Sequence, residues 1–283
     1  MTSFTYEQKQ TILQVENLSV AYNGKLIIQD INFTERDTVR PDRQQGQIIA
    51  FLGRSGRGKS TLFRALTGLE SPTTGQVLIP DLSKEVTNGN QPAKKVSEGD
   101  VGFVDQKYTL FRHKTVFQSL LFAMRRSTLS LAEKKEKVLQ YLSDWGLTQV
   151  KDQYPVFLSG GQRQRTAILE QLLSSGYYMV LDEPFSGLDV GNIESVKRAF
   201  QWVNASHELH TIIFSTHDIE LAVELADSIY VLGYPKDEKG NLGTAGTLLK
   251  HFDLKSMGLA WQEDFGNHHL DCVKLIRETM LAS

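Results

Sequence analysis

The stretch of sequence that decides the fold runs from residue 47 to residue 66 and reads QIIAFLGRSGRGKSTLFRAL. Its first six residues are apolar apart from Gln47, which predicts a buried strand. Residues 53–60 then match the pattern G-x-x-x-x-G-K-[ST]. A helix is expected over residues 59–69, with leucines 62, 66 and 69 on one face. A strand, a glycine loop and a helix in this order predict a loop that holds phosphate.

The residue types in this loop suit a nucleotide. Glycines let successive backbone N–H groups face one anion, and the helix that follows points its positive end at the same place. Lys59 would neutralise the β- and γ-phosphates, Ser60 offers Mg²⁺ a hard oxygen, and Thr61 is expected at the α-phosphate. The alternative, a glycine-rich turn with a chance lysine, does not explain the flanking strand and helix. The residues expected to bind ATP here are Gly53, Arg54, Ser55, Gly56, Arg57, Gly58, Lys59, Ser60 and Thr61.

Two adjacent carboxylates follow a second short apolar run. Residues 178–181 predict a buried strand, and Asp182 and Glu183 come directly after it, where ligands collect in open α/β sheets. Asp182 is expected to hold Mg²⁺, and Glu183 to orient or deprotonate the water that attacks the γ-phosphorus. Taken alone, the pair could equally be a solvated strand end.

The rest of the chain predicts an α/β fold. Short apolar strands alternate with helices in the second half, which favours a mainly parallel sheet covered on both faces. Residues 115–175 are expected to be mostly helical, with a capping box formed by Ser130 and Glu133. Further expected elements are strands at 12–20, 26–33, 211–215 and 228–232, a turn at Asn23-Gly24, and helices at 192–205, 218–226 and from about 268. Residues 84–100 are expected to form a surface loop or an insertion within the first lobe.

The amino-acid composition excludes few classes of protein. The 283 residues are 40% hydrophobic, which suffices for one large domain or two modest ones. Thirty-one basic and 33 acidic side chains give a net charge of -2, so charge does not favour nucleic acid. Cys272 stands alone, which excludes an intrachain disulfide. We expect neither a secretion signal nor a membrane span, because no apolar run reaches about 18 residues.

The segment Leu158-Ser-Gly-Gly-Gln162 carries the most specific resemblance. LSGGQ is the distinguishing motif of the ABC ATPase superfamily, and the chain resembles that family over residues 12–233. The resemblance implies a P-loop NTPase core with a mainly parallel sheet, an N-terminal antiparallel β subdomain and an inserted helical subdomain at about 108–175. It places the nucleotide-binding domain at 1–233 and leaves 234–283 as a C-terminal extension.

The same motif implies a dimer. In the family, this segment of one subunit closes over ATP held by its partner, which assigns Ser159, Gly160, Gly161 and Gln162 to a contact in trans. A simpler interpretation is that Ser159 and Gln162 form an S-x-x-Q helix cap. A cap alone does not explain the two glycines.

Four smaller features resemble the family's other motifs. Tyr22 matches an aromatic that stacks on adenine, and Gln106 matches the Q-loop glutamine that senses Mg²⁺ and the γ-phosphate. Asp189 matches the D-loop aspartate at the dimer interface, and His217 the switch histidine. The resemblance therefore implies catalytic roles for Glu183, His217 and Gln106. The metal would be held by Ser60, Gln106 and Asp182. Departures from the commonest family pattern are Arg57, Asp105 and Glu170-Gln171.

The function implied is ATP hydrolysis that powers an ABC transporter, with ATP and Mg²⁺ as cofactors. Residues 108–122 resemble the matching stretch of bacterial importers of small polar solutes, and their apolar side chains are expected to receive a permease helix. The expected partners are an identical second ATPase subunit, transmembrane permease subunits and a solute-binding protein, with no nucleic acid. The expected location is the cytoplasmic face of the cell membrane. An exporter, a lipid-transport ATPase and a non-transport ABC ATPase are the alternatives.

Overall fold

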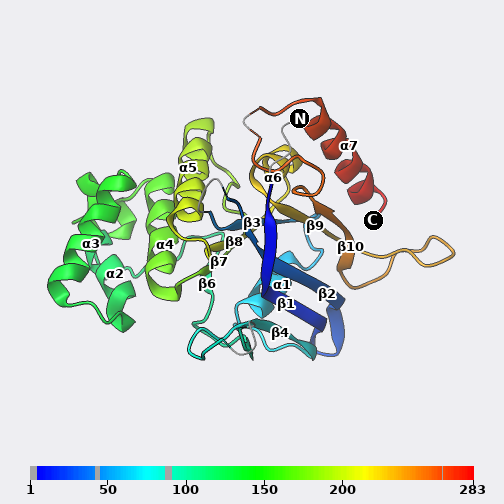
Figure 1. The fold of residues 1–283 in the computed structure, drawn as a ribbon, viewed down its shortest axis with the longest axis horizontal. Coiled ribbons are helices and arrows are strands. Elements are labelled where there is room, and N and C mark those ends of the chain that lie inside the picture. Colours follow the sequence, from blue (N-terminus) through cyan, green and yellow to red (C-terminus); the bar gives the residue numbers. More distant parts are fainter. Residues whose placement is uncertain (1–4, 42–44, 87–90, 263) are drawn as a thin grey trace.

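The computed structural model describes residues 5–41, 45–86, 91–262 and 264–283 (Figure 1). Two sheets meet around helix α1 (Lys59–Leu66). The first sheet has four antiparallel strands in the order β2-β1-β4-β5, formed by β1 (Glu7–Tyr22), β2 (Lys25–Val39), β4 (Thr74–Pro80) and β5 (Ala93–Lys95). The turn expected at Asn23-Gly24 is confirmed: both residues have positive φ, 51° and 79°, as a tight hairpin requires.

The second sheet has six strands in the order β10-β9-β3-β8-β7-β6. All neighbouring pairs are parallel except β10 with β9. Its strands are β3 (Gln47–Leu52), β6 (Gly102–Val104), β7 (Tyr178–Leu181), β8 (Thr211–Thr216), β9 (Ser228–Gly233) and β10 (Thr247–Asp253). Every residue of β3 is buried, because each face of this strand meets a different core. Ile49 and Phe51 pack toward α1 and the first sheet, whereas Ile48 and Leu52 pack toward the helices of the opposite face.

Helices cover the face of the six-stranded sheet that lies opposite α1, and some of them form a lobe at its side. The lobe, green in Figure 1, consists of α2 (Val116–Ala123), α3 (Leu131–Asp144) and α4 (Gly160–Ser175), with 3₁₀ turns at Met124–Arg126, Thr148–Val150 and Pro155–Phe157. The capping box of Ser130 and Glu133 is present at the start of α3. The remaining helices are α5 (Val190–Ser206), α6 (Ile219–Leu225) and α7 (Asn267–Leu281). Among the described helices, none is both long and apolar enough to cross a membrane.

Two expectations from the sequence were wrong in detail. Strand β2 continues past Phe33 to Val39, because polar residues in the extra segment find partners in the core: the Tyr230 hydroxyl donates to Glu35 over 2.8 Å. Helix α1 ends at Leu66, before Gly68 with φ of 72°, so Leu69 is exposed. Of the two alternatives for residues 84–100, the insertion in the first lobe agrees with the structure, because the segment contains strand β5, which pairs with β4; residues 87–90 lie outside the described part.

The C-terminal segment is joined to the six-stranded sheet. Strand β10 pairs with β9, and the backbone N–H of Leu254 donates to the Asp227 carbonyl over 3.0 Å. Lys255, itself buried, donates to the Ser228 hydroxyl over 3.0 Å and lies 3.1 Å from an Asp253 carboxylate oxygen. The carboxylate of Asp227 is buried too and accepts from the Ile48 N–H over 2.7 Å. A buried cation thus compensates the carboxylates where β9, β10 and β3 meet.

Replacing Lys255 with methionine should lower the free energy of unfolding by about 3 kcal/mol, because it leaves buried carboxylates without their cation. Urea denaturation of the purified chain measures this change. Lys274→Met on the exposed side of α7 is the matched control and should change stability little. Equal stability of both variants would show that the Lys255 cluster does not attach the C-terminal segment.

Candidate nucleotide-binding site

The glycine loop adopts a backbone that only glycine fits at two positions. Gly58, the residue before α1, has φ of 95°, and a Cβ atom there would lie 2.4 Å from the Ile28 methyl carbon Cγ2. A Cβ atom on Gly53 would lie 2.6 Å from the Leu232 carbonyl oxygen. The loop is therefore packed tightly against β2 and β9, while the first turn of α1 points its free N–H groups into the loop.

The acidic pair is held in place by the neighbouring strand. Because β7 and β8 are parallel with Leu181 opposite Phe214, the residues that follow them lie side by side. The Ser215 hydroxyl donates to Asp182 Oδ1 over 2.6 Å and accepts from the Glu183 N–H over 2.9 Å. Glu183 has φ of 51°, an uncommon value for a residue with a side chain. Ser215 therefore holds the carboxylate of Asp182 and the backbone of Glu183.

Lys59, Glu183 and His217 form a chain of contacting polar side chains. The Lys59 ammonium donates to the Gly53 carbonyl over 2.7 Å and lies 3.3 Å from Glu183 Oε1. The other carboxylate oxygen of Glu183 lies 3.0 Å from His217 Nδ1. Lys59 and Glu183 are 8% and 16% exposed, but His217 is 71% exposed. The pair of lysine and glutamate is thus shielded from water, and the histidine lies at its open side.

One cavity of about 460 Å³ gathers most of the predicted site residues. It is lined by the loop and helix residues 55–61 together with Gln106, Asp182, Glu183 and His217. Ser186, which begins the segment that resembles the D-loop, also lines it, as does Ile27, which the sequence did not single out. Three predicted residues, Gly53, Arg54 and Tyr22, are not among the described residues that line this cavity.

Tyr22 lies beside the start of α1. Its hydroxyl donates to Glu70 over 2.8 Å, and its side chain is 40% exposed. Partial burial, together with the Glu70 carboxylate, raises the pKa of the phenol. An exposed ring at this place is compatible with adenine stacking, which stays a prediction.

The LSGGQ residues form the helix cap that the simpler interpretation describes. Ser159 accepts from the Gln162 N–H over 3.3 Å, and the Gln162 side chain accepts from the Ser159 N–H over 2.9 Å. The cap does not use the glycines: a Cβ atom on Gly160 would point into open space, and one on Gly161 would lie 2.3 Å from the Asn192 side chain. None of the four residues lines the cavity around Lys59. Their contact with a partner's ATP stays a prediction.

Asp189 also has a role within the chain. It is the N-cap of α5, where its carboxylate accepts from the Asn192 N–H over 2.9 Å and from the Asn192 side chain over 2.8 Å. Its place at a dimer interface stays a prediction.

The donor set fits magnesium bound together with a nucleotide. Ser60, Gln106 and Asp182 all line the cavity and supply the hard oxygen ligands that Mg²⁺ prefers. Within the described residues, no group of three or more His, Cys, Asp or Glu could hold a metal by itself. Phosphate oxygens and water would therefore have to complete the coordination, and the metal would neutralise phosphate charge there.

Sequence reasoning missed three residues that support the site. One is Ser215. Its place follows from the parallel pairing of β7, which ends at Leu181, with β8, which contains Ser215. The other two are Gln164 and Tyr108, whose side chains both donate to the carbonyl of Pro184, the residue after Glu183. No motif marked them, because their contact joins segments far apart in sequence.

Replacing Ser215 with alanine should lower the rate of ATP hydrolysis at least about tenfold, because Asp182 and Glu183 both lose a hydrogen bond. The KM for ATP should change little, since Ser215 does not line the cavity. Steady-state kinetics separate the two constants. Ser215→Thr keeps the hydroxyl and should restore much of the rate; an alanine variant as fast as the threonine variant would contradict the positioning role.

Comparison with known proteins shows the family of the chain. The family model described as ABC transporter matches residues 37–186. The sulfate/thiosulfate import ATP-binding protein CysA 1 of Agrobacterium fabrum is 38% identical over 219 residues, which cover 75% of this chain and 60% of the relative. The CysA protein of Acinetobacter baylyi is 39% identical over 241 residues, 83% of this chain and 62% of the relative. The chain thus spans about three fifths of the length of these relatives.

Solved structures show the same fold. The chain is similar to cbiO1 from Clostridium perfringens, described as part of the ABC transporter complex cbiONQ. The TM-score is 0.68 at 25% identity, covering 96% of this chain and 99% of that one. A bacterial ABC transporter cassette in a dimeric structure gives a TM-score of 0.63 at 22% identity, covering 86% and 99%. The phosphate loop, the acidic pair and the LSGGQ segment lie on this fold, and the chain belongs to the ABC transporter family.

Proposed function

We propose that this chain binds and hydrolyses Mg-ATP and thereby powers an ABC transporter that imports a small oxyanion. The observation that carries the proposal is the convergence of Lys59, Glu183 and His217 on one cavity lined by the glycine loop. A cation for phosphate, a carboxylate for water and an exposed imidazole are the groups that phosphoryl transfer to water needs.

The pairing of Lys59 with Glu183 supports a role for both side chains in turnover. A triphosphate in the loop offers Lys59 a second anion, so its bond to Glu183 would weaken as the nucleotide enters. Glu183 would then be free to accept a proton from the attacking water, while its backbone stays fixed by Ser215. His217 lies within reach to donate a hydrogen bond to the γ-phosphate.

The function requires two copies of the chain. The Gly160 position is open and leaves bare backbone at the start of α4, where a helix N-terminus attracts phosphate. Because the four LSGGQ residues lie outside the cavity of their own chain, the phosphate they approach would be that of a partner. Asp189, at the start of α5, would lie at the same interface.

A groove beside the lobe suits a permease helix. A cavity of about 530 Å³ is lined by apolar side chains such as Phe111 and by Arg125 and Glu170. Phe111 and Phe122 are both 38% exposed and their rings lie 5.4 Å apart. Burial raises the pKa of Glu170 to about 7, while the positive charge of Arg125 acts to lower it. Exposed aromatic rings beside an exposed arginine and a buried carboxyl group fit an amphipathic helix at the cytoplasmic face of the membrane.

The names of the relatives support the substrate class. Several are sulfate/thiosulfate import ATP-binding proteins, so the solute proposed here is a small oxyanion delivered by a solute-binding protein. In a strain lacking this chain, uptake of radiolabelled sulfate should fall and return when the gene is restored. Restoration with the Glu183→Gln variant should fail. Unchanged uptake in the deletion strain would refute the oxyanion assignment while leaving ATP hydrolysis intact.

Glu183→Gln and Lys59→Ala should separate hydrolysis from binding. The glutamine keeps the shape but removes the base, so turnover should fall at least about a hundredfold while ATP still binds. Lys59→Ala should weaken ATP binding itself, measured with a fluorescent ATP analogue. Normal hydrolysis by the Glu183→Gln chain would contradict the assignment.

The same Glu183→Gln chain provides a test of the shared site. It should form an ATP-dependent dimer in size-exclusion chromatography, and adding Ser159→Arg should abolish that dimer by placing a bulky side chain at the start of α4. A dimer that survives Ser159→Arg would contradict contacts in trans.

A further inference from the structure

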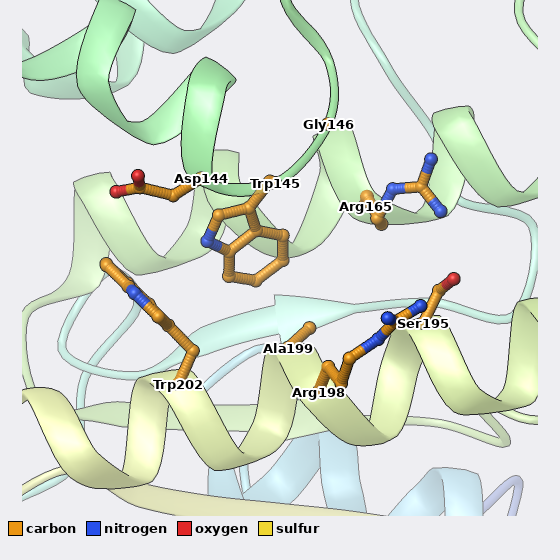
Figure 2. Close-up of a pocket in the computed structure, with 8 residues that line it drawn as sticks. All are labelled: Asp144, Trp145, Gly146, Arg165, Ser195, Arg198, Ala199 and Trp202. Carbon is orange, nitrogen blue, oxygen red and sulfur yellow. The ribbon is translucent and has the colours of Figure 1, made fainter.

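A second cavity, of about 430 Å³, lies where the helical lobe meets the catalytic core (Figure 2). It shares no lining residue with the nucleotide cavity. Three helices form it: Asp144 and Trp145 come from the end of α3, Arg165 comes from α4, and Ser195, Arg198 and Trp202 come from α5. The function proposed above gives this cavity no role.

One end of the cavity is positively charged. In Figure 2, Arg165 on α4 and Arg198 on α5 lie on opposite sides of the same end. Within the part of the chain that the structure describes, neither guanidinium forms an ion pair with a carboxylate. The Nε atom of Arg165 is buried and has no hydrogen-bond partner among the described residues. Burial, and then the charge of Arg198, lower the pKa of Arg165.

The single carboxylate in the lining does not neutralise this end. Asp144 accepts a hydrogen bond from the Gln140 side chain over 2.8 Å, and in Figure 2 it lies on the side of the cavity away from the arginines. Two guanidinium groups that share a cavity without a counter-ion repel each other, and an anion placed between them removes that cost.

The other end of the cavity is aromatic. The rings of Trp145 and Trp202 lie 5.9 Å apart, nearly perpendicular at 80°, and Ala199 adds an apolar surface. Trp145 is 7% exposed, and its indole N–H is buried without a hydrogen-bond partner. Apolar walls opposite two cationic donors are typical of a site for a small amphipathic molecule.

We propose that this cavity binds a small organic acid, with its carboxylate between Arg165 and Arg198 and its apolar part against Trp145 and Trp202. An organic acid fits better than an inorganic anion, because a sulfate ion would fill only the arginine end and leave the aromatic walls unused. A bound ligand would contact α3, α4 and α5 together. It would therefore stabilise one orientation of the lobe relative to the core.

Tryptophan fluorescence provides a direct test that needs no ATP hydrolysis. The chain has three tryptophans, and the third, Trp261, lies beside Tyr6, outside this cavity. In a Trp261→Phe background, hexanoate at constant ionic strength should give a saturable change in emission. Hexanol, with the same tail and no charge, should give none, and sulfate should bind more weakly than hexanoate.

Variants of the two arginines test whether they bind the carboxylate of the ligand. Arg165→Gln and Arg198→Gln should each weaken hexanoate binding at least about tenfold, because each removes one charge-assisted contact. Arg198 is exposed, so its variant should fold normally, and circular dichroism checks both. Arg277→Gln on the exposed face of α7 is the matched control and should bind as the parent does.

Three results would overturn the proposal. They are the absence of a saturable signal with hexanoate, unchanged affinity in the Arg198→Gln variant, and binding of sulfate as tight as that of hexanoate. The last result would indicate an inorganic anion site in place of a site for an organic acid.

Discussion

The parallel pairing of β3, β8 and β7 is the constraint on which the rest of the site depends. Leu52 lies opposite Thr216, so β3 and β8 end level with each other, and Leu181 lies opposite Phe214, so β7 ends two residues earlier at the same edge of the sheet. The glycine loop, the acidic pair and His217 all follow these ends directly. Residues that are more than 100 positions apart in the chain therefore meet without long loops, and hydrogen bonds between backbones set the distance between Lys59 and Glu183.

Local signals in the sequence predicted the elements that local chemistry determines. The α/β fold is confirmed, as are the Asn23-Gly24 turn, the strand at 178–181 and the capping box of Ser130. Each depends on residues within a few positions of one another, so the pattern alone contains the information. Most residues expected to bind the nucleotide also line one cavity, because the loop, the strand and the helix are contiguous.

What the sequence could not predict depends on distant partners. The polar sequence at the end of β2 is typical of a loop. It forms a strand because Glu35 accepts a hydrogen bond from Tyr230, which is 195 residues away in the chain. Ser215 and Gln164 support the catalytic segment through contacts of the same kind, and neither residue type is distinctive by itself. The roles assigned to Ser159 and Asp189 in a dimer are a further example, since in the single chain both are helix caps. A cap keeps such a residue fixed in place before any partner arrives.

Strand β10 has a consequence for solubility. A parallel sheet that ended at β9 would present a row of unpaired N–H and C=O groups, and another chain could add a strand there. The C-terminal segment occupies that edge with an antiparallel strand that carries a register irregularity between Leu248 and Lys250 and an exposed lysine side chain. Irregular pairing and a charged side chain both disfavour further strand addition. Strand β10 thus leaves the six-stranded sheet with an edge that is poorly suited to pairing with a strand of another molecule.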